Sequence, residues 1–493
     1  MSSSLTHVGR GSAPQVKESR SPAHKSSLVI WALILAGTIL RLIALGHKSF
    51  WLDEIASVTI ARRPWPTLLH FLWHDEGNMA LYYVLLKPWL HFGHGEAAVR
   101  LLSVIAGVVS IPLMYRLGSR LLGGTAATLI ATLLAALSTC AIAVSQEARA
   151  YSFLVLFGLL STYLFVRLIE RPGYSLALGY ALISGLTCYF HYFGVLLPAA
   201  HAISIFALPA RRRPWKPLLL AWSIIALLAS PILWLMHAQD VGHISWLQTP
   251  SWLELYHLGV FLAADGGKAV GAVLLAIELV LAGLFLAKLP TVWREHSDGL
   301  LRWHYALIAS LVFAPVVITL LVSIVRPAFY HRFLIICLPG WLLMIAIGAE
   351  QLRVRAWRVA ALVVVCTLSL VTTVLWYRRA TEDWRGAVNY LIANTGPEDR
   401  VVYYQSVGEF AGESYREWLQ PPNILTPAAI GINLTNPGWH TEIADARRVW
   451  LVLYRVKPDD AGASAIERQL DEQYALHGLS FFQGVMVLEY DAR

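Results

Sequence analysis

Long apolar runs recur along this chain, and they constrain its fold more than any other feature. Several of them reach the roughly 20 residues that a helix needs to cross the hydrocarbon core of a bilayer. Only 14% of the residues are charged and 57% are hydrophobic, whereas a soluble protein carries roughly 25% charged residues. So few charges cannot solvate a soluble surface of this size. The sequence therefore predicts an all-α, multispanning membrane protein and excludes a soluble enzyme.

Eleven apolar segments are predicted to span the membrane, within a transmembrane region that runs over residues 27–376. The first 26 residues are polar, basic and rich in serine, which predicts a disordered N-terminus. The apolar run after them is too long for a signal peptide and is expected to remain as the first span. The predicted spans are approximately residues 28–46, 98–117, 125–145, 150–168, 175–190, 192–209, 217–237, 269–288, 304–325, 332–349 and 357–376.

The basic residues between these spans predict the orientation of the chain. Lys and Arg accumulate in cytoplasmic loops, and with a cytoplasmic N-terminus every inside loop of this chain is basic. The outer loops are poor in cations apart from the long first one, residues 47–97, and Arg378 and Arg379 run mildly against the pattern. Because the cations lie in short loops and not on one folded face, we attribute the net charge of +8 to topology and expect no nucleic-acid partner. We expect a multi-pass protein of the inner (plasma) membrane. The inside-loop cations are Arg116, Arg120, Arg167, Arg171, Arg211, Arg212, Arg213, Lys216, Lys288, Arg294, Arg302, Arg353, Arg355 and Arg358.

Two regions outside the spans are long enough to have a function. The first outer loop, residues 47–97, is too long for a simple connection. Within it Met79–Phe92 is apolar and aromatic but too short to span, which predicts one or two helices in the membrane interface. A second outer loop, about residues 238–268, holds Trp252 and Tyr256, which favour the same interface.

The composition changes to that of an ordinary soluble protein from Tyr377 onward. This predicts a small extracytoplasmic α/β domain over residues 377–493. Helices are expected at residues 382–394 and 461–474, and strands at 400–405, 448–455 and 484–490.

Polar residues beside spans indicate function, because a charge within the bilayer costs about 2.5–3.5 kcal/mol or more. Arg41, inside the first span, is expected to point into an outer site. The first polar cluster is Asp53 and Glu54, directly after that span. Adjacent acids lie about 100° apart on a helix, so one can act as a base while the other binds a cation or orients an arginine. The alternative is an interfacial helix start, whose dipole favours acids.

The second cluster, His74 to Asn78, lies in the same loop. Asp75, Glu76 and Asn78 offer oxygen ligands for a divalent metal or for the hydroxyls of a sugar. A solvated turn explains the same residues, and for this cluster taken alone the turn is favoured.

The third cluster, Ser145 to Tyr151, joins two predicted spans. Glu147 and Tyr151 are four residues apart and Gln146 and Arg149 are three apart, so each pair is expected on one helix face. An arginine at this position is suited to binding a phosphate. The alternative is a Glu/Arg pair that only ties a turn.

The fourth and fifth clusters contain His191, and Tyr330, His331 and Arg332. Each combines aromatic rings with a potential contact to a phosphate or a sugar, and the alternative is anchoring of the rings in the interface. All five clusters fall on the outer side of the predicted topology. Because the orientation came from cations in the inside loops, this agreement supports one outer-leaflet site.

The order of three motifs resembles that of a known family. Trp51-Leu52-Asp53-Glu54, Asn78-Met79-Ala80-Leu81-Tyr82-Tyr83 and Gln146-Glu147-Ala148-Arg149-Ala150-Tyr151 are similar to motifs of the bacterial protein-mannosyltransferase-like glycosyltransferases, GT-C fold enzymes akin to family 39 and to the lipid A aminoarabinose transferases. Pro327–Arg332 and Asp383-Trp384-Arg385 are also similar, and the resemblance covers roughly residues 28–390. Many relatives carry Pro-Pro-Leu-Tyr where this chain has Met79-Ala80-Leu81-Tyr82.

This resemblance implies an inverting glycosyltransferase that moves a sugar from a polyprenyl-phosphate donor to an extracytoplasmic glycan, lipid or protein acceptor. In such a displacement a carboxylate removes the proton of the acceptor hydroxyl, and we choose Asp53 for that base, with Glu54 as the other predicted catalytic residue. Asp75, Glu76 and Asn78 would contact the acceptor or a metal. No ligand set in the sequence is unambiguous, so the cofactor is left open, with a divalent cation as one candidate. The residues expected at the donor phosphate and sugar are Arg149, Glu147, Tyr151, His191, Tyr330, His331 and Arg332.

The alternative function is a polyprenyl-lipid or sugar transporter, or flippase, without transfer chemistry. A transporter should place polar residues near the bilayer midplane, often in two related halves. Here the acids gather at one face and no internal repeat is visible. A structural membrane subunit would leave the clustering of acids with aromatic residues unexplained. The sequence therefore favours an enzyme.

Overall fold

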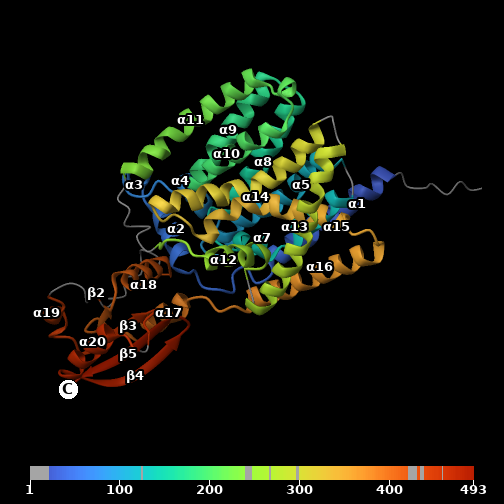
Figure 1. The fold of residues 1–493 in the computed structure, drawn as a ribbon. Helices are drawn as coiled ribbons and strands as arrows, with labels where there is room; N and C mark the ends of the chain where they lie inside the picture. The colour runs from blue at the N-terminus through green and yellow to red at the C-terminus, as the bar shows by residue number, and fades with distance from the viewer. Residues whose placement is uncertain are drawn as a thin grey trace, which may run out of the picture.

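The computed structural model describes residues 22–123, 126–238, 247–265, 268–295, 299–419, 430–433, 438–457 and 459–493. The predicted disordered N-terminus, residues 1–26, lies outside these residues as far as residue 21, and for residues 22–26 the prediction is wrong, because they belong to the first helix. Long helices fill the first three quarters of the chain, and a small sheet with helices follows at the C-terminal end (Figure 1). The predicted fold class is thus confirmed.

Every predicted span coincides with one helix or with two or three consecutive helices. Among the described residues, seven helices are long and apolar enough to cross a membrane, and α6 with α7 makes an eighth if this bent pair is one span. The other three predicted spans are shorter apolar helices, at residues 27–42, 174–190 and 192–207. The membrane helices are α1 (Pro22–Leu42), α5 (Glu96–Leu122), α6 (Ala126–Leu137), α7 (Thr139–Ser145), α8 (Tyr151–Glu170), α9 (Tyr174–Phe190), η2 (Tyr192–Val195), α10 (Leu196–Ser204), η3 (Ile205–Ala207), α11 (Trp215–Ala238), α13 (Lys268–Glu295), α14 (Leu300–Val325), η6 (His331–Cys337), α15 (Leu338–Glu350) and α16 (Arg355–Arg378).

The first outer loop folds into three helices and a short 3-10 turn. These are α2 (Leu52–Arg62), α3 (Trp65–His74), α4 (Ala80–Trp89) and η1 (Leu90–Phe92). The helix expected within Met79–Phe92 is confirmed, and Met79 begins it in the left-handed conformation (φ 60°). Helix α3 was not predicted, and neither was α12 (Trp252–Ala263) in the second outer loop.

A five-stranded mixed sheet forms the core of the C-terminal region. Its strand order is β2-β1-β3-β5-β4, with β1 parallel to β2 and β3, and β5 antiparallel to β3 and β4. The predicted helices and strands are present, although β4 begins at Tyr474, where the last helix was expected to end. The elements are α17 (Trp384–Asn394), β1 (Arg400–Tyr403), α18 (Ser406–Leu419), β2 (Ile430–Asn433), α19 (Trp439–Ile443), β3 (Arg448–Tyr454), α20 (Ala461–Asp471), β4 (Tyr474–Phe482) and β5 (Val485–Ala492).

The first outer loop and the sheet lie at the same end of the helix bundle. Figure 1 shows α2 and α18 side by side between the bundle and the sheet, with α1 entering from the opposite end. We call the end that carries α2 the outer end, following the predicted orientation. At the opposite end Arg120 is paired with Glu170 at 3.0 Å, which joins two of the predicted inside loops.

Candidate active site

The carboxylate of Glu54 is the centre of a buried polar cluster at the outer end. Both of its oxygens accept hydrogen bonds from Arg100 of α5, at 2.8 and 2.6 Å, and Oε1 also accepts the backbone N–H of Ala148 at 2.7 Å. Glu54 is fully buried and Arg100 is 3% exposed. A buried charge needs such a complete set of partners. Glu54 thus orients an arginine, one of the two roles expected for the acid pair.

Asp53 has a different environment, although it is the adjacent residue. It lies in the first turn of α2, and its side chain is 38% exposed. Arg149 approaches one carboxylate oxygen at 3.5 Å and donates to the backbone carbonyl of Asp53 at 3.2 Å and to Ser57 Oγ at 3.3 Å. Because this carboxylate is partly exposed, a bound molecule can reach it and pass it a proton.

Residues 146–150 form a non-helical turn between α7 and α8. The expectation that Glu147 and Tyr151, and Gln146 and Arg149, share helix faces is therefore wrong. The turn is held by tertiary bonds that sequence spacing cannot show. The Gln146 amide donates to the carbonyls of Arg41 and Ile43 and accepts from Trp376 Nε1 at 3.0 Å, so the turn is fastened to α1 and α16.

This turn places Glu147 against Arg332, and the two side chains form an ion pair. The guanidinium of Arg332 also lies 5.3 Å from the Trp51 ring and 5.2 Å from the Tyr151 ring. Burial raises the pKa of Glu147 to about 7, and Arg332 opposes that rise. The third and fifth sequence clusters thus meet the first in one site.

His191 contributes a buried neutral ring at the break between α9 and η2. Its ring centroid lies 6.0 Å from that of Tyr151 and 4.9 Å from that of Phe333. Burial lowers the pKa of His191 to about 3, so the ring carries no positive charge at neutral pH. Its Nε2 is buried and has no hydrogen-bond partner in the described part of the chain. His191 is therefore suited to a hydrogen bond with a ligand and not to charge stabilisation.

Tyr330 and His331 lie on the α12 side of the site. Their ring centroids are 4.5 Å apart, and His331 also approaches Phe261 at 5.5 Å and His257 at 6.1 Å. Tyr330 in turn lies 5.0 Å from Phe333. The second outer loop therefore forms one wall of the site.

Besides Arg100, two further charged residues near this site were not predicted. Lys48 donates to the carbonyl of Trp376 at 2.6 Å and lies over its ring, and burial lowers the pKa of Lys48 to about 8. Asp265, just after α12, interacts electrostatically with Arg332, Arg379 and Lys48, while burial raises its pKa. Each lies in a loop, where a single charged residue gives no signal of function in the sequence. Only the tertiary structure shows that the two residues lie near the site.

The second sequence cluster lies at the edge of the site. Asn78 Oδ1 accepts the backbone N–H of Tyr192 at 3.1 Å, which ties the cluster to the residue after His191. Asp75 is exposed at the end of α3, whereas Glu76 is partly buried and acts electrostatically on Arg149. No group of three or more His, Cys, Asp or Glu side chains in the described residues is arranged to hold a metal ion.

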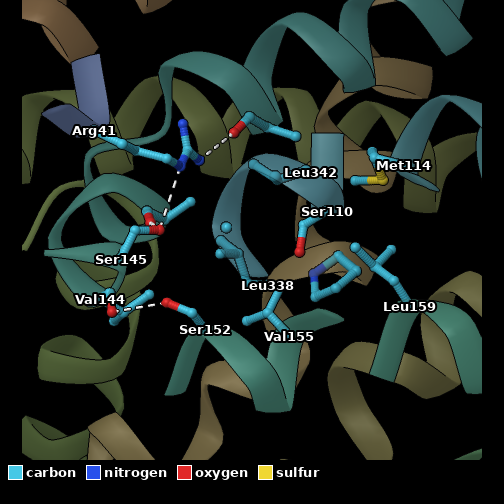
Figure 2. A pocket seen from close by; sticks show the side chains of 14 residues that line it. Arg41, Ser110, Met114, Val144, Ser145, Ser152, Val155, Leu159, Leu338 and Leu342 are labelled. Atoms are coloured by element: carbon cyan, nitrogen blue, oxygen red, sulfur yellow. Dashed lines mark hydrogen bonds between the residues drawn. The ribbon is translucent and has the colours of Figure 1, made fainter. Parts of the chain in front are cut away.

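Arg41 does not point into this site, contrary to expectation. It donates to the carbonyls of Gly37, Ala135 and Ala136 at 2.9–3.1 Å and to Ser145 Oγ at 3.3 Å. It thereby satisfies carbonyls in the last turn of α6 that the break before α7 leaves unpaired. Figure 2 shows Arg41 at one wall of a small cavity that is otherwise mostly apolar, with Leu338, Leu342 and Val155 among its lining residues.

The arrangement combines an exposed carboxylate with arginines and aromatic faces at the outer end of the bundle. Asp53 can accept a proton, while Arg149 and Arg332 can stabilise an anionic group. The rings of Trp51 and Tyr151 offer faces for a sugar or a lipid chain. An acid, cations and apolar surface together suit a reaction on an amphipathic anion.

The chain is similar in sequence to one known family. The family described as dolichyl-phosphate-mannose-protein mannosyltransferase matches residues 83–235. No curated protein sequence matches.

Solved structures of glycosyltransferases share the fold. The Cupriavidus metallidurans ArnT structure in the apo state superposes with a TM-score of 0.63 at 13% identity, covering 95% of this chain and 98% of that one. The same protein bound to undecaprenyl phosphate gives 0.60 at 12% identity, with the same coverage. The Archaeoglobus fulgidus oligosaccharyltransferase AglB, in complex with an inhibitory peptide and a dolichol-phosphate, gives 0.53 at 11%, covering 87% and 69%. The GT-C fold inferred from the motifs is thus confirmed.

Proposed function

We propose that this protein is a membrane glycosyltransferase that moves a sugar from a polyprenyl-phosphate donor to an acceptor hydroxyl at the outer face of the membrane. The observation that carries the proposal is the pairing of the exposed Asp53 carboxylate with Arg149, beside the Glu147–Arg332 pair. The shared fold supports it, because one of the similar structures holds undecaprenyl phosphate.

In the proposed reaction the acceptor oxygen attacks C1 of the sugar from the side opposite the phosphate. The C1–O bond to the phosphate breaks, the acceptor proton passes to Asp53, and the polyprenyl phosphate leaves with one additional negative charge. In-line displacement inverts the configuration at C1. The atoms and charges of this step balance without a further reactant.

Arg149 and Arg332 would stabilise the charge that develops on the departing phosphate. Both are mostly buried, with side chains 12% and 15% exposed, so a charge that they meet is weakly screened by water. The neutral ring of His191 would donate a hydrogen bond to a phosphate or sugar oxygen, while Tyr151, Tyr330 and His331 would line the donor site. Asp75, Glu76 and Asn78, at the edge of the site, would contact the acceptor.

The test is a donor assay with the purified full-length protein in lipid vesicles. Polyprenyl-phosphate sugars with different labelled sugars would be supplied one at a time, together with a membrane extract as a source of acceptor. We expect one donor to release free polyprenyl phosphate and to transfer its label to an acceptor. Movement of labelled donor across the bilayer without release would contradict the proposal and favour a transporter.

A further inference from the structure

We propose that Glu382, in the segment that links α16 to α17, is a positioning residue that holds Asp53 in place by capping the first turn of α2. This inference rests on the proposed function, because it takes Asp53 as the base. It also gives the C-terminal region a role in the reaction.

The chain between α1 and α2 has no regular structure in its last residues, so its backbone groups need partners from elsewhere. Arg100 supplies partners on the side of the bundle. It donates to the carbonyls of Leu45 at 2.9 Å, Lys48 at 2.8 Å and Ser49 at 3.0 Å. The other side of this segment faces the C-terminal region.

Glu382 binds the start of α2 from that side. Its Oε2 accepts the backbone N–H of Leu52, the first residue of α2, at 3.0 Å, and the indole N–H of Trp384 at 3.3 Å. Its other oxygen is paired with Arg455. Glu382 is 8% exposed, so its carboxylate is buried between the C-terminal region and the first outer loop.

A helix start needs such a partner, because its first N–H groups have no acceptor within the helix. The N-cap residue here is Trp51, whose side chain makes no capping hydrogen bond. A carboxylate is also favoured by the dipole at this end of a helix. Glu54 Oε2 accepts the backbone N–H of Trp51 at 3.4 Å. Glu382, from a distant part of the sequence, adds the acceptor for the next N–H, that of Leu52.

Tyr415 of α18 holds the residues just before this helix. Its hydroxyl donates to Glu96 at 2.6 Å and lies 3.3 Å from Ser49 Oγ and 3.4 Å from the backbone N of Phe50. The Phe50 ring packs against the rings of Tyr415 and Trp418 at 6.0 and 5.9 Å. The C-terminal region thus contacts three of the four residues that precede Asp53.

Asp53 directly follows Leu52, so movement of the helix start changes the distance between the Asp53 carboxylate and Arg149. Misplacement of a reacting group by about 1 Å can lower a rate roughly 100-fold. Glu382 touches neither substrate in this account, and it acts only through α2. Its loss should therefore lower kcat and leave the KM for the donor unchanged.

The experiment compares Glu382→Leu with Glu382→Gln in the full-length protein. Glutamine keeps an oxygen that can accept the Leu52 N–H, whereas leucine does not. Glu489→Leu is the matched control, because Glu489 is also paired with an arginine, Arg448, in the same region, and among the described residues its side chain makes no hydrogen bond to the first outer loop. Two measurements are made on each: hydrogen exchange of a peptide covering residues 49–56, and kcat and KM for whichever donor the wild type consumes.

In Glu382→Leu we expect exchange at the Leu52 amide to be roughly tenfold faster and kcat to fall roughly 10- to 100-fold. Glu382→Gln should retain most of the protection of the Leu52 amide and most of kcat. Glu489→Leu should match the wild type in both measurements. If Glu382→Leu does not fold, Tyr415→Phe is the variant to measure instead, because it removes only one hydroxyl. It should speed hydrogen exchange at the backbone N–H of Phe50. Unchanged exchange over residues 49–56 in Glu382→Leu, or an equal change in Glu489→Leu, would overturn the inference. If the wild type consumes no donor, the proposed function fails, and the exchange result alone decides whether Glu382 holds α2.

Discussion

Neighbouring residues with the same chemistry have different roles in this site. Glu54 is enclosed by Arg100 and the Ala148 N–H, so its carboxylate is saturated with partners. Asp53 keeps a partly exposed carboxylate with one cation at its side. Their separation of about 100° around α2 directs one into the bundle and the other toward the site. The proposal of Asp53 as the base therefore rests on its environment and not on residue type.

Lys48 provides a prediction on pH dependence. With its pKa lowered to about 8, Lys48 is a cation below that pH and loses its charge as the pH rises through it. A phosphodiester donor keeps one fixed negative charge over this range. If Lys48 helps to hold the donor, the KM for the donor should rise roughly tenfold between about pH 7 and pH 9.

The matched control for this effect is Lys48→Arg. A guanidinium stays charged throughout the range, so the KM of this variant should not change over the same pH interval. A flat profile in the wild type, or the same rise in Lys48→Arg, would contradict a role for the lysine charge. The measurement is donor release at fixed acceptor and variable donor concentration.

At the scale of elements, the candidate site is formed at positions where helices begin or end. Helix α2 begins at Leu52, the turn after α7 carries Glu147 and Arg149, and the break before η2 carries His191. Helix ends leave backbone groups unpaired, and side chains from other elements satisfy them. The functional residues are therefore tied to the packing of the whole bundle.

The packing of α2 on α5 provides a prediction on stability. Arg100→Met leaves the Glu54 carboxylate buried without its counter-charge, and such a loss costs about 3–5 kcal/mol. Glu54→Leu combined with Arg100→Met should cost less than the two single changes added together. The control is Arg120→Met, which breaks an ion pair whose arginine side chain is 39% exposed, and such pairs contribute about 0–1 kcal/mol. Equal unfolding midpoints for Arg100→Met and Arg120→Met in detergent would show that the buried pair does not stabilise the fold.

The sequence predicted the positions of these elements well, because apolar runs report directly on membrane helices. It did not predict α3 or α12, which lie in loops rich in aromatic residues without a clear period. It also placed Glu147 and Arg149 on a continuous helix, because spacing cannot show a turn that tertiary bonds hold open. A signal for Arg100 was available, since this charge lies inside a predicted span, where charges are costly.

For the site, the sequence predicted that residues from several distinctive motifs lie close together. Asp53, Glu147, Arg149 and Arg332 are joined in the structure by two ion pairs. It could not identify Lys48 or Glu382, because each acquires its partners from a distant segment.

At the scale of the whole molecule, the site, the first outer loop and the sheet lie at one end (Figure 1). The orientation of that end in the membrane is a prediction from the basic residues of the opposite loops. All four cysteines lie within membrane helices, and three of them are buried. A single new cysteine at an exposed loop or helix position can therefore report on sidedness.

We expect Ser464→Cys, on the exposed part of α20, to react with a membrane-impermeant maleimide in intact cells whose outer barrier has been opened. Arg353→Cys, exposed between α15 and α16 at the opposite end of the bundle, should react only after the inner membrane is permeabilised. Each change would be made in a chain whose four native cysteines are replaced by alanine. The reverse labelling pattern would contradict the predicted orientation and place the site on the cytoplasmic side.

The most direct test of the account is the chemistry of Asp53. Asp53→Asn keeps the size of the side chain and removes the base, so donor should still bind while release of polyprenyl phosphate falls by roughly 100-fold or more. Asp471→Asn, which changes an exposed acid at the end of α20 and outside the site, is the matched control and should leave the rate unchanged. If Asp53→Asn releases polyprenyl phosphate as fast as the wild type, Asp53 is not the base and the proposed mechanism is wrong.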